Sequence, residues 1–160
     1  MFAERGFHAT SMDEVAERAG VTKPVVYQHF PSKRALYLEL LQESTQELIE
    51  RVAQATTEAT TGREQVELGF AAYFSYAAEH PDAFRLLFGS SVRDDPEFAS
   101  FAAQVVDGVA ELIGSLIEID GPPEQRRALA HAIFGMAEAT SRRVALRGEV
   151  QDRKSTRLNS

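Results

Sequence analysis

Residues 11–33 read SMDEVAERAGVTKPVVYQHFPSK, and this stretch decides the fold. Ser11 and Glu14 have the spacing of a capping box, in which each side chain bonds the backbone amide of the other at a helix start. Gly20 follows the first helical run and supplies the left-handed residue that ends a helix. A second, shorter run begins two residues later. The stretch therefore predicts two short helices joined by a tight turn, which is the signature of a helix-turn-helix.

The second helix of this pair is expected over about residues 23–30. Pro24 fits its first turn, where backbone amides have no intrahelical partner, and Pro31 ends it. At about 100° per residue, Val26 and Phe30 fall on one side, where we expect them to pack against the rest of the chain. The remaining positions, which face outward, are Lys23, Pro24, Val25, Tyr27, Gln28 and His29.

These outward side chains suit a DNA duplex, because the second helix of such a motif enters the major groove. Gln28 can bond adenine through both amide atoms, and Val25 with Pro24 can meet a thymine methyl group. The residues expected to meet phosphates, on either rim and at nearby helix starts, are Lys23, Tyr27, His29, Lys33, Thr10 and Ser11. Taken singly, Tyr27 or His29 would more often be a packing residue and Lys33 a solvated charge. Their grouping at this spacing favours an interface.

Charge is spread unevenly along the chain of 160 residues, whose net charge is −7. Between Glu17 and Glu39 there are four basic and no acidic side chains, which favours an anionic partner for this region, although chance fluctuation of surface charge is the simpler alternative. There is no cysteine, which excludes disulfides and thiolate metal sites. No apolar run approaches the roughly 20 residues of a membrane span, and the first residues lack a signal-peptide pattern. We expect a cytoplasmic protein with no membrane partner.

The rest of the chain has helical periodicity, and no segment alternates with the period of a strand. Helices are expected over residues 33–55, 63–79, 82–88, 95–118 and 124–147, with loops at 56–62 and 89–94. We therefore predict an all-α fold, in which an N-terminal helix-turn-helix domain precedes a helical bundle.

The last nine residues, 152–160 (DRKSTRLNS), differ in kind from the rest, with one apolar side chain and no helical period. They resemble the translation of a short-read sequencing adapter, and we interpret them as a non-native tail. A disordered basic tail is the alternative.

The N-terminal part resembles the DNA-binding region of the tetracycline-repressor (TetR) family. The resemblance runs from Phe2 to Leu41 and includes FAERGF at residues 2–7, VAERAGV at 15–21, YQHF at 27–30 and SK at 32–33. The C-terminal part resembles the family's ligand-binding and dimer-forming region more loosely, chiefly in the segment HPDAFRLLF.

This resemblance implies a homodimeric repressor that leaves a palindromic DNA operator when a small-molecule effector binds the helical bundle. The DNA-contacting positions that it implies agree with those derived from the helix geometry, and they add Thr22. The complete predicted set is Thr10, Ser11, Thr22, Lys23, Pro24, Val25, Tyr27, Gln28, His29 and Lys33.

The family has a full helix before FAERGF and a further dimer-forming helix near its C-terminus, so we expect the chain to be truncated at both ends. The predicted domains are residues 1–41 (helix-turn-helix, with most of the first helix missing), 42–151 (effector binding and dimerisation, incomplete) and 152–160 (the tail). Loss of the first helix is expected to expose Val26 and Phe30 and to weaken DNA binding.

A mainly apolar effector pocket is expected between the bundle helices, with a few polar groups that orient the ligand. For most of the aromatic side chains in this region, ordinary core packing is the competing explanation. The candidate effector-binding residues are Phe70, Tyr73, Phe74, Tyr76, Arg85, Phe88, Phe101 and His131.

An enzyme is the competing class of protein, and the sequence disfavours it. The histidines lie in different segments without metal-ligand spacing, and there is neither a phosphate-cradling glycine loop nor a nucleophile elbow. We therefore expect no catalytic residue, no metal and no cofactor. A further alternative is a helical small-molecule sensor or interaction module that no longer binds DNA because of truncation. Such a module would lack the steep salt dependence of DNA binding.

Overall fold

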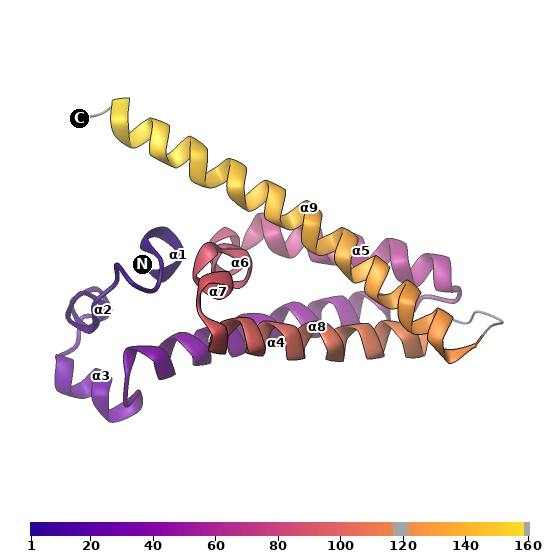
Figure 1. Cartoon of the computed structure of the whole chain (residues 1–160), viewed down its shortest axis with the longest axis horizontal. Coiled ribbons are helices and arrows are strands. Elements are labelled where there is room, and N and C mark those ends of the chain that lie inside the picture. Colours follow the sequence, from indigo (N-terminus) through magenta and orange to yellow (C-terminus); the bar gives the residue numbers. More distant parts are fainter. Residues whose placement is uncertain (117–121, 159–160) are drawn as a thin grey trace.

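Helices make up all of the regular secondary structure in the part of the chain that the computed structural model describes, residues 1–116 and 122–158 (Figure 1). Side chains are described for these residues except 90, 112, 114–116, 141, 142 and 144–158. In chain order the helices are α1 (Phe2–Arg5), α2 (Met12–Ala19), α3 (Lys23–His29), α4 (Lys33–Thr56), α5 (Gly62–Glu79), α6 (Pro81–Phe88), α7 (Ser90–Asp94), α8 (Pro96–Leu116) and α9 (Pro123–Leu158). The predicted all-α fold is confirmed. None of the described helices is long and apolar enough to cross a membrane.

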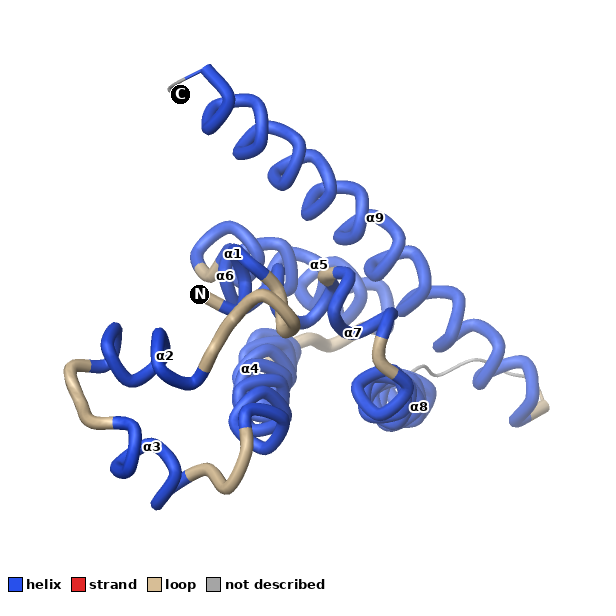
Figure 2. The backbone as a smooth tube through the Cα atoms, turned by 60° about the vertical axis from the view of Figure 1, so that its left-hand side comes forward, coloured by secondary structure: helices blue, strands red, loops and turns tan. Residues whose placement is uncertain are grey.

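The helix α4 connects the two parts of the molecule. Its 24 residues extend over about 36 Å. The helices α2 and α3 lie at its N-terminal end, away from the bundle (Figure 2). Farther along, α5 packs on α4 and α9 packs on α8, so the longer helices form the bundle (Figure 1).

The predicted start and end of α2 are confirmed. The amide of Glu14 donates to Ser11 Oγ at 3.2 Å, and the amide of Ser11 donates to Glu14 Oε2 at 2.9 Å. These bonds with Ser11, together with the side chain of Arg5, lower the pKa of Glu14 to about 2. Gly20 has φ 69° and ψ 26°, the left-handed conformation that closes the helix. The start of α4 is capped as expected, because Ser32 Oγ accepts from the amide of Ala35 at 3.0 Å.

One buried cluster joins the N-terminal helices to the first turns of α8. Phe98, which is fully buried, lies with its ring centroid 5.0 Å from that of Phe7 and 4.5 Å from that of Tyr37. The members of this cluster are Phe2, Phe7, Met12, Ala16, Val26, Leu36, Tyr37, Leu41, Leu86, Val92 and Phe98. The expected exposure of Val26 is therefore wrong, since its side chain is only 6% exposed. Phe30 is partly buried and packs against the same cluster.

Two helix boundaries differ from the expectation. Residues 90–94, expected to form a loop, form α7 because Val92 turns inward and joins the buried cluster. A Cβ at Gly89 would lie 2.4 Å from the carbonyl oxygen of Arg85, so only glycine permits the tight turn that precedes α7. The last helix runs to Leu158 rather than ending near residue 147, and it includes most of the expected tail. The interpretation of that tail as adapter-derived stays a prediction.

Candidate functional site

The first candidate site is the outward face of α3. Val26 is the one buried side chain of this helix, whereas the next residue, Tyr27, is 42% exposed. The predicted division of the helix into an inner and an outer face is therefore confirmed. The exposed residues at the start of α3 and along it are Thr22, Lys23, Pro24, Val25, Tyr27, Gln28 and His29.

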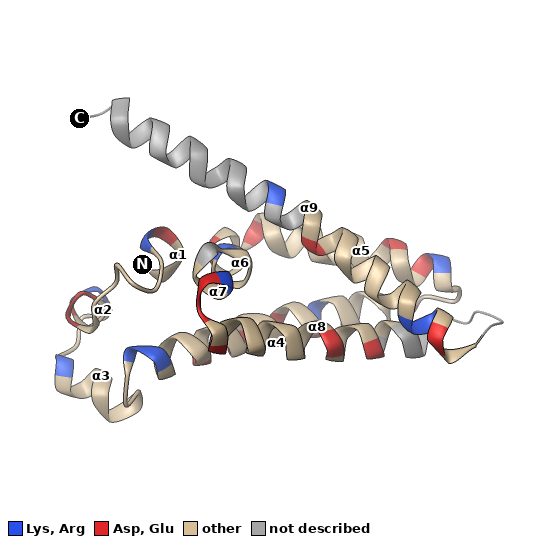
Figure 3. Ribbon diagram, in the orientation of Figure 1, with Lys and Arg blue, Asp and Glu red and all other residues tan. Residues whose placement is uncertain are grey.

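α3 carries one lysine and no acidic residue (Figure 3). The neighbouring helix α2 binds the side chain of this lysine, Lys23. Lys23 Nζ lies 2.8 Å from Asp13 Oδ1 of α2. Hydrogen bonding to Asp13 raises the pKa of Lys23, so this side chain stays charged at neutral pH. Thr22 stands at the N-cap position, but its hydroxyl makes no capping bond. The surface therefore offers an exposed amide, apolar side chains and a cation.

Besides Lys23, three further predicted DNA-contacting side chains, those of Thr10, Ser11 and Lys33, are engaged within the protein. Thr10 is only 1% exposed, and its hydroxyl donates to the carbonyl oxygen of Gly6 at 2.9 Å. The hydroxyl of Ser11 accepts from Glu14 and donates to its carboxylate at 2.9 Å. Burial removes the Thr10 hydroxyl from any surface that DNA can reach, so this position does not fit its expected role.

Lys33 also has a different environment from the one expected. Its Nζ donates to the carbonyl oxygens of Phe7 at 2.7 Å and Thr10 at 2.8 Å, and it lies 4.5 Å from the centroid of the Phe7 ring. A cation bound to two carbonyl oxygens and to the face of a ring is already well satisfied. In this structure Lys33 fixes the segment that precedes α2 instead of pointing toward a phosphate.

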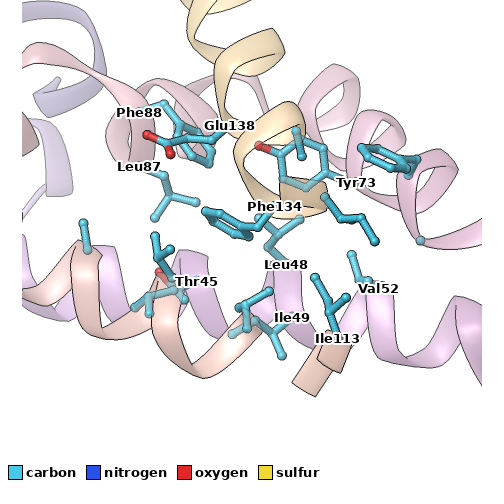
Figure 4. Close-up of a pocket in the computed structure, with 18 of the residues that line it drawn as sticks. Thr45, Leu48, Ile49, Val52, Tyr73, Leu87, Phe88, Ile113, Phe134 and Glu138 are labelled. Carbon is cyan, nitrogen blue, oxygen red and sulfur yellow. The ribbon is translucent and has the colours of Figure 1, made fainter. Parts of the chain in front are cut away.

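The second candidate site is a cavity of about 680 Å³ inside the bundle. The C-terminal half of α4 forms one wall with Leu48, Ile49 and Val52, and α5, α6, α7, α8 and α9 supply the others (Figure 4). Most side chains that line the cavity are apolar, and the few polar ones include Thr45, Tyr73 and Glu138. Its size lies within the roughly 300–1,000 Å³ of small-molecule sites.

Four of the eight predicted effector-binding residues line this cavity. These are Phe70, Tyr73, Phe88 and Phe101. Phe74 and His131 are exposed on the outside of the bundle. Arg85 does not line the cavity, and its Nη1 lies 3.6 Å from Asp82 Oδ1. The helical pattern placed these residues on the right elements, but it did not give the side of the helix that faces the cavity.

Tyr76 is likewise outside the cavity, in the contact between α5 and α4. It is fully buried, and its hydroxyl lies 3.3 Å from the carbonyl oxygen of Ser44 and 3.2 Å from Glu47 Oε2. Burial, reinforced by the negative charge of Glu47, raises the pKa of Tyr76 to about 12. A neutral phenol that donates to α4 is a packing group.

The sequence reasoning named no residue of the cavity wall on α4, where the inward side chains form an apolar stripe. Thr45 was the available signal, since it is a polar residue within the stripe and is only 8% exposed. Glu138 gave a weaker signal, because a carboxylate in the last helix looks like any solvated charge. Among the described residues, no group of three or more histidine or acidic side chains could hold a metal ion.

Comparison with known proteins finds that the chain is similar to bacterial transcriptional regulators. Residues 1–40 match the sequence model of the bacterial regulatory proteins of the tetR family. The chain is 35% identical over 133 residues to the HTH-type transcriptional activator FasR of Mycolicibacterium smegmatis, a match that covers 83% of this chain and 61% of that relative. The chain thus spans about three fifths of the length of this curated relative.

Two solved structures have the same fold. A TetR-like transcriptional regulator from Rhodococcus sp. RHA1 superposes with a TM-score of 0.73 and 28% identity, over 92% of this chain and 79% of that one. The transcriptional regulator FadR from Bacillus subtilis, crystallised in complex with stearoyl-CoA, gives a TM-score of 0.77 at 20% identity, over 92% and 83% of the two chains. The N-terminal helices and the bundle are therefore arranged as in regulators of this type.

Proposed function

From the match of residues 1–40 to the tetR family model and the likeness to regulators of this type, we propose that the chain belongs to the TetR family and is part of a transcriptional regulator whose affinity for DNA changes when a small molecule enters the bundle. The observation that carries the proposal is the outward face of α3, which is exposed along its length while Val26 anchors the helix from behind. An enzymatic activity is not part of the proposal, since the relatives are regulators.

In this proposal Gln28 and Val25 meet base edges in the major groove, and Lys23 with Tyr27 and His29 meets the phosphates on its rims. Thr22 joins the phosphate contacts, because its hydroxyl is exposed and makes no capping bond. Thr10 and Lys33 are left out of the contacting set, since their polar groups are bonded within the protein.

Selection of duplexes from a random DNA library tests the interface. Gln28→Ala is expected to reduce discrimination at one base pair by about tenfold, because a bidentate contact to adenine is lost. Lys23→Ala is expected to weaken binding to all sequences and to lower the salt slope by about one. Gln42→Ala, on an exposed turn of α4, is the matched control. Absence of salt-dependent DNA binding, with ligand binding retained, would instead support the sensor that does not bind DNA.

We also propose that the regulator acts in the cytoplasm as a homodimer on a palindromic operator. The supporting observation is an exposed apolar pair on α9, where Leu129 is 38% and Met136 57% exposed. Seven residues apart, they lie on the same face of the helix, as an association surface requires. Met136→Glu is expected to shift the sedimentation coefficient toward that of a monomer, whereas Glu124→Gln, an exposed change on the same helix, is not.

We propose that the protein is a repressor, which leaves its operator when the effector binds. The relative in M. smegmatis is named an activator, so a reporter gene has to distinguish repression from activation. Repression predicts higher reporter expression when the regulator is deleted. Activation predicts lower expression.

For the effector we propose a molecule with a long aliphatic chain, such as a fatty acyl-CoA. The support is the apolar lining of the cavity and the stearoyl-CoA held by the B. subtilis structure of the same fold. Stearoyl-CoA at about 100 times its dissociation constant is expected to raise the unfolding free energy by about 2.7 kcal/mol. Val52→Trp, which fills the cavity, is expected to abolish that gain. Leu68→Trp, on the exposed outer face of α5, carries the same ring and is expected to keep it.

A further inference from the structure

Arg34, in the first turn of α4, reaches across to the junction of α7 and α8. Its Nη1 lies 2.9 Å from Asp95 Oδ1 and its Nη2 lies 2.8 Å from Asp95 Oδ2, while Nη1 also donates to Glu97 Oε2 at 2.9 Å. Figure 3 shows the basic start of α4 and the acidic start of α8 at the same end of the bundle. A bidentate contact of this kind fixes the orientation of the guanidinium and the carboxylate as well as the distance between them.

Asp95 is also bonded to the first turn of α8. Its Oδ1 accepts from the amide of Glu97 at 3.0 Å and lies 3.4 Å from the amide of Phe98, so the carboxylate caps the helix. The side chain is only 7% exposed, and the guanidinium of Arg34 also lies 4.9 Å from the centroid of the Phe98 ring. A displacement of the first turn of α8 therefore moves Arg34 with it.

The same corner holds the segment that leads into α2. Lys33, the neighbour of Arg34, is bonded to the carbonyl oxygens of Phe7 and Thr10. From the other side, the amide of Phe7 donates to Ser91 Oγ of α7 at 3.0 Å. The position of α2, and with it α3, is thus set by contacts that meet at the start of α4 and the α7–α8 junction.

The cavity reaches this junction as well. Val92 and Arg93 precede Asp95 and line the cavity, and Ala99 and Phe101 line it one turn farther along. A ligand that fills the cavity presses on residues on both sides of Asp95, while Asp95 itself lies outside the lining.

From these contacts we infer that Arg34 and Asp95 are positioning residues that couple the cavity to the DNA-facing helix. The inference rests on the proposed function. In the proposed function this ion pair touches neither the ligand nor the DNA. We assign to the pair part of the coupling free energy, by which bound ligand changes the affinity for DNA and bound DNA changes the affinity for the ligand. Arg51 and Glu79 form the natural comparison, because they join α4 to α5 through one exposed contact at 2.6 Å, away from the α7–α8 junction.

The test is the ratio of DNA dissociation constants with and without saturating stearoyl-CoA. Asp95→Asn is the sharpest variant, because asparagine caps a helix as well as aspartate but carries no charge. Couplings between sites are commonly about 5- to 150-fold. Asp95→Asn and Arg34→Gln are each expected to reduce the wild-type ratio by about fivefold or more, with no further loss in the double variant. Arg51→Gln is expected to leave it unchanged.

A second measurement needs no DNA, and its comparison with Val52→Trp needs no bound ligand either. Amide hydrogen exchange of residues 7–10 and α2 is compared with the cavity open, filled by stearoyl-CoA, or filled by Val52→Trp. Filling is expected to change exchange in the wild-type background and to have no effect there in the Asp95→Asn background. Circular dichroism verifies that each variant is folded.

The outcomes separate this inference from the proposed function. A wild-type chain that binds neither DNA nor stearoyl-CoA contradicts the proposed function, and the Val52→Trp comparison then decides the coupling by itself. A DNA-affinity ratio that Asp95→Asn and Arg34→Gln leave within twofold of the wild type overturns the inference. The inference is also overturned if cavity filling changes hydrogen exchange at residues 7–10 equally in the wild type and in Asp95→Asn.

Discussion

The first turn of α4 is held by hydrogen bonds and ion pairs of Lys33 and Arg34, whereas farther along the helix presents Leu48, Ile49 and Val52 to a cavity. Lys33 is bonded to backbone carbonyls of residues 7–10, and Arg34 is bonded to carboxylates at the α7–α8 junction. The residues along the cavity contribute mainly dispersion contacts, which tolerate rearrangement better than hydrogen bonds with fixed geometry. One helix thus combines an end that fixes neighbouring parts with a half that can adapt to a ligand.

Phe98→Ala is expected to have the largest effect on this comparison, because Phe98 is the fully buried ring where α8 meets Phe7 and Tyr37. Its removal is expected to lower the unfolding free energy by about 3–5 kcal/mol, measured by urea denaturation. The matched control is Phe74→Ala, an exposed ring on α5, with an expected loss of about 0.5 kcal/mol or less. Equal losses would mean that the two parts of the molecule do not share a core.

Lys33→Met tests whether the start of α4 is a structural clamp. The change keeps the aliphatic stem but leaves the carbonyl oxygens of Phe7 and Thr10 without their donor, and it is expected to cost about 1–3 kcal/mol in urea denaturation. Lys23→Met, an exposed lysine on α3, is expected to leave stability unchanged. If Lys33→Met spares stability and weakens DNA binding more than Lys23→Met does, the original expectation of a phosphate contact is right.

The charge of Asp95 gives a pH-dependent test of the same end of α4. Hydrogen bonds from Arg34, with those from the amides of Phe98 and Glu97, lower the pKa of Asp95 from 3.8 to about 2. Because this pKa is lower in the folded chain than in the unfolded one, the pair stabilises the fold above about pH 4, and that contribution disappears as the pH falls toward 2. A carboxyl-carbon NMR titration is expected to give a midpoint near 2 that rises in Arg34→Gln and stays in place in Arg51→Gln. A normal midpoint in the wild type would contradict the contact.

Asp13→Asn is expected to have the smallest effect and concerns the surface rather than the core. The pair of Asp13 with Lys23 is exposed, so its loss should not change the denaturation midpoint measurably. Freed from Asp13, Lys23 is expected to bind phosphate better, raising DNA affinity by about twofold to fivefold. Glu17→Gln removes the same charge from the same helix, and an equal gain in that variant would show that only net charge matters.

The sequence was sufficient for features that depend on local geometry. The inward position of Val26 and the exposure of Gln28 and Tyr27 follow from turning one helix, and the capping box of Ser11 with Glu14 needs only a spacing of three residues. These predictions concern residues close in the chain, where the backbone conformation fixes how side chains point.

Features that depend on distant segments were missed or misplaced. Lys33 looks like a phosphate ligand in the sequence, and only the fold brings the carbonyl oxygens of Phe7 and Thr10 to it. The contact of Arg34 with Asp95 joins residues 61 positions apart. Half of the predicted effector residues line the cavity, because helical periodicity identifies the apolar face of a helix. The other half do not, because periodicity does not say which neighbouring element that face meets.

The most direct test of the account is amide chemical-shift mapping of this chain during titration with a duplex recovered by selection. The largest shifts are expected in Thr22–His29, with a smaller response in residues 7–10 and at the α7–α8 junction. Shifts confined to α8 and α9, or an unperturbed α3 in the presence of a saturating duplex, would contradict the assignment of α3 as the DNA-binding helix.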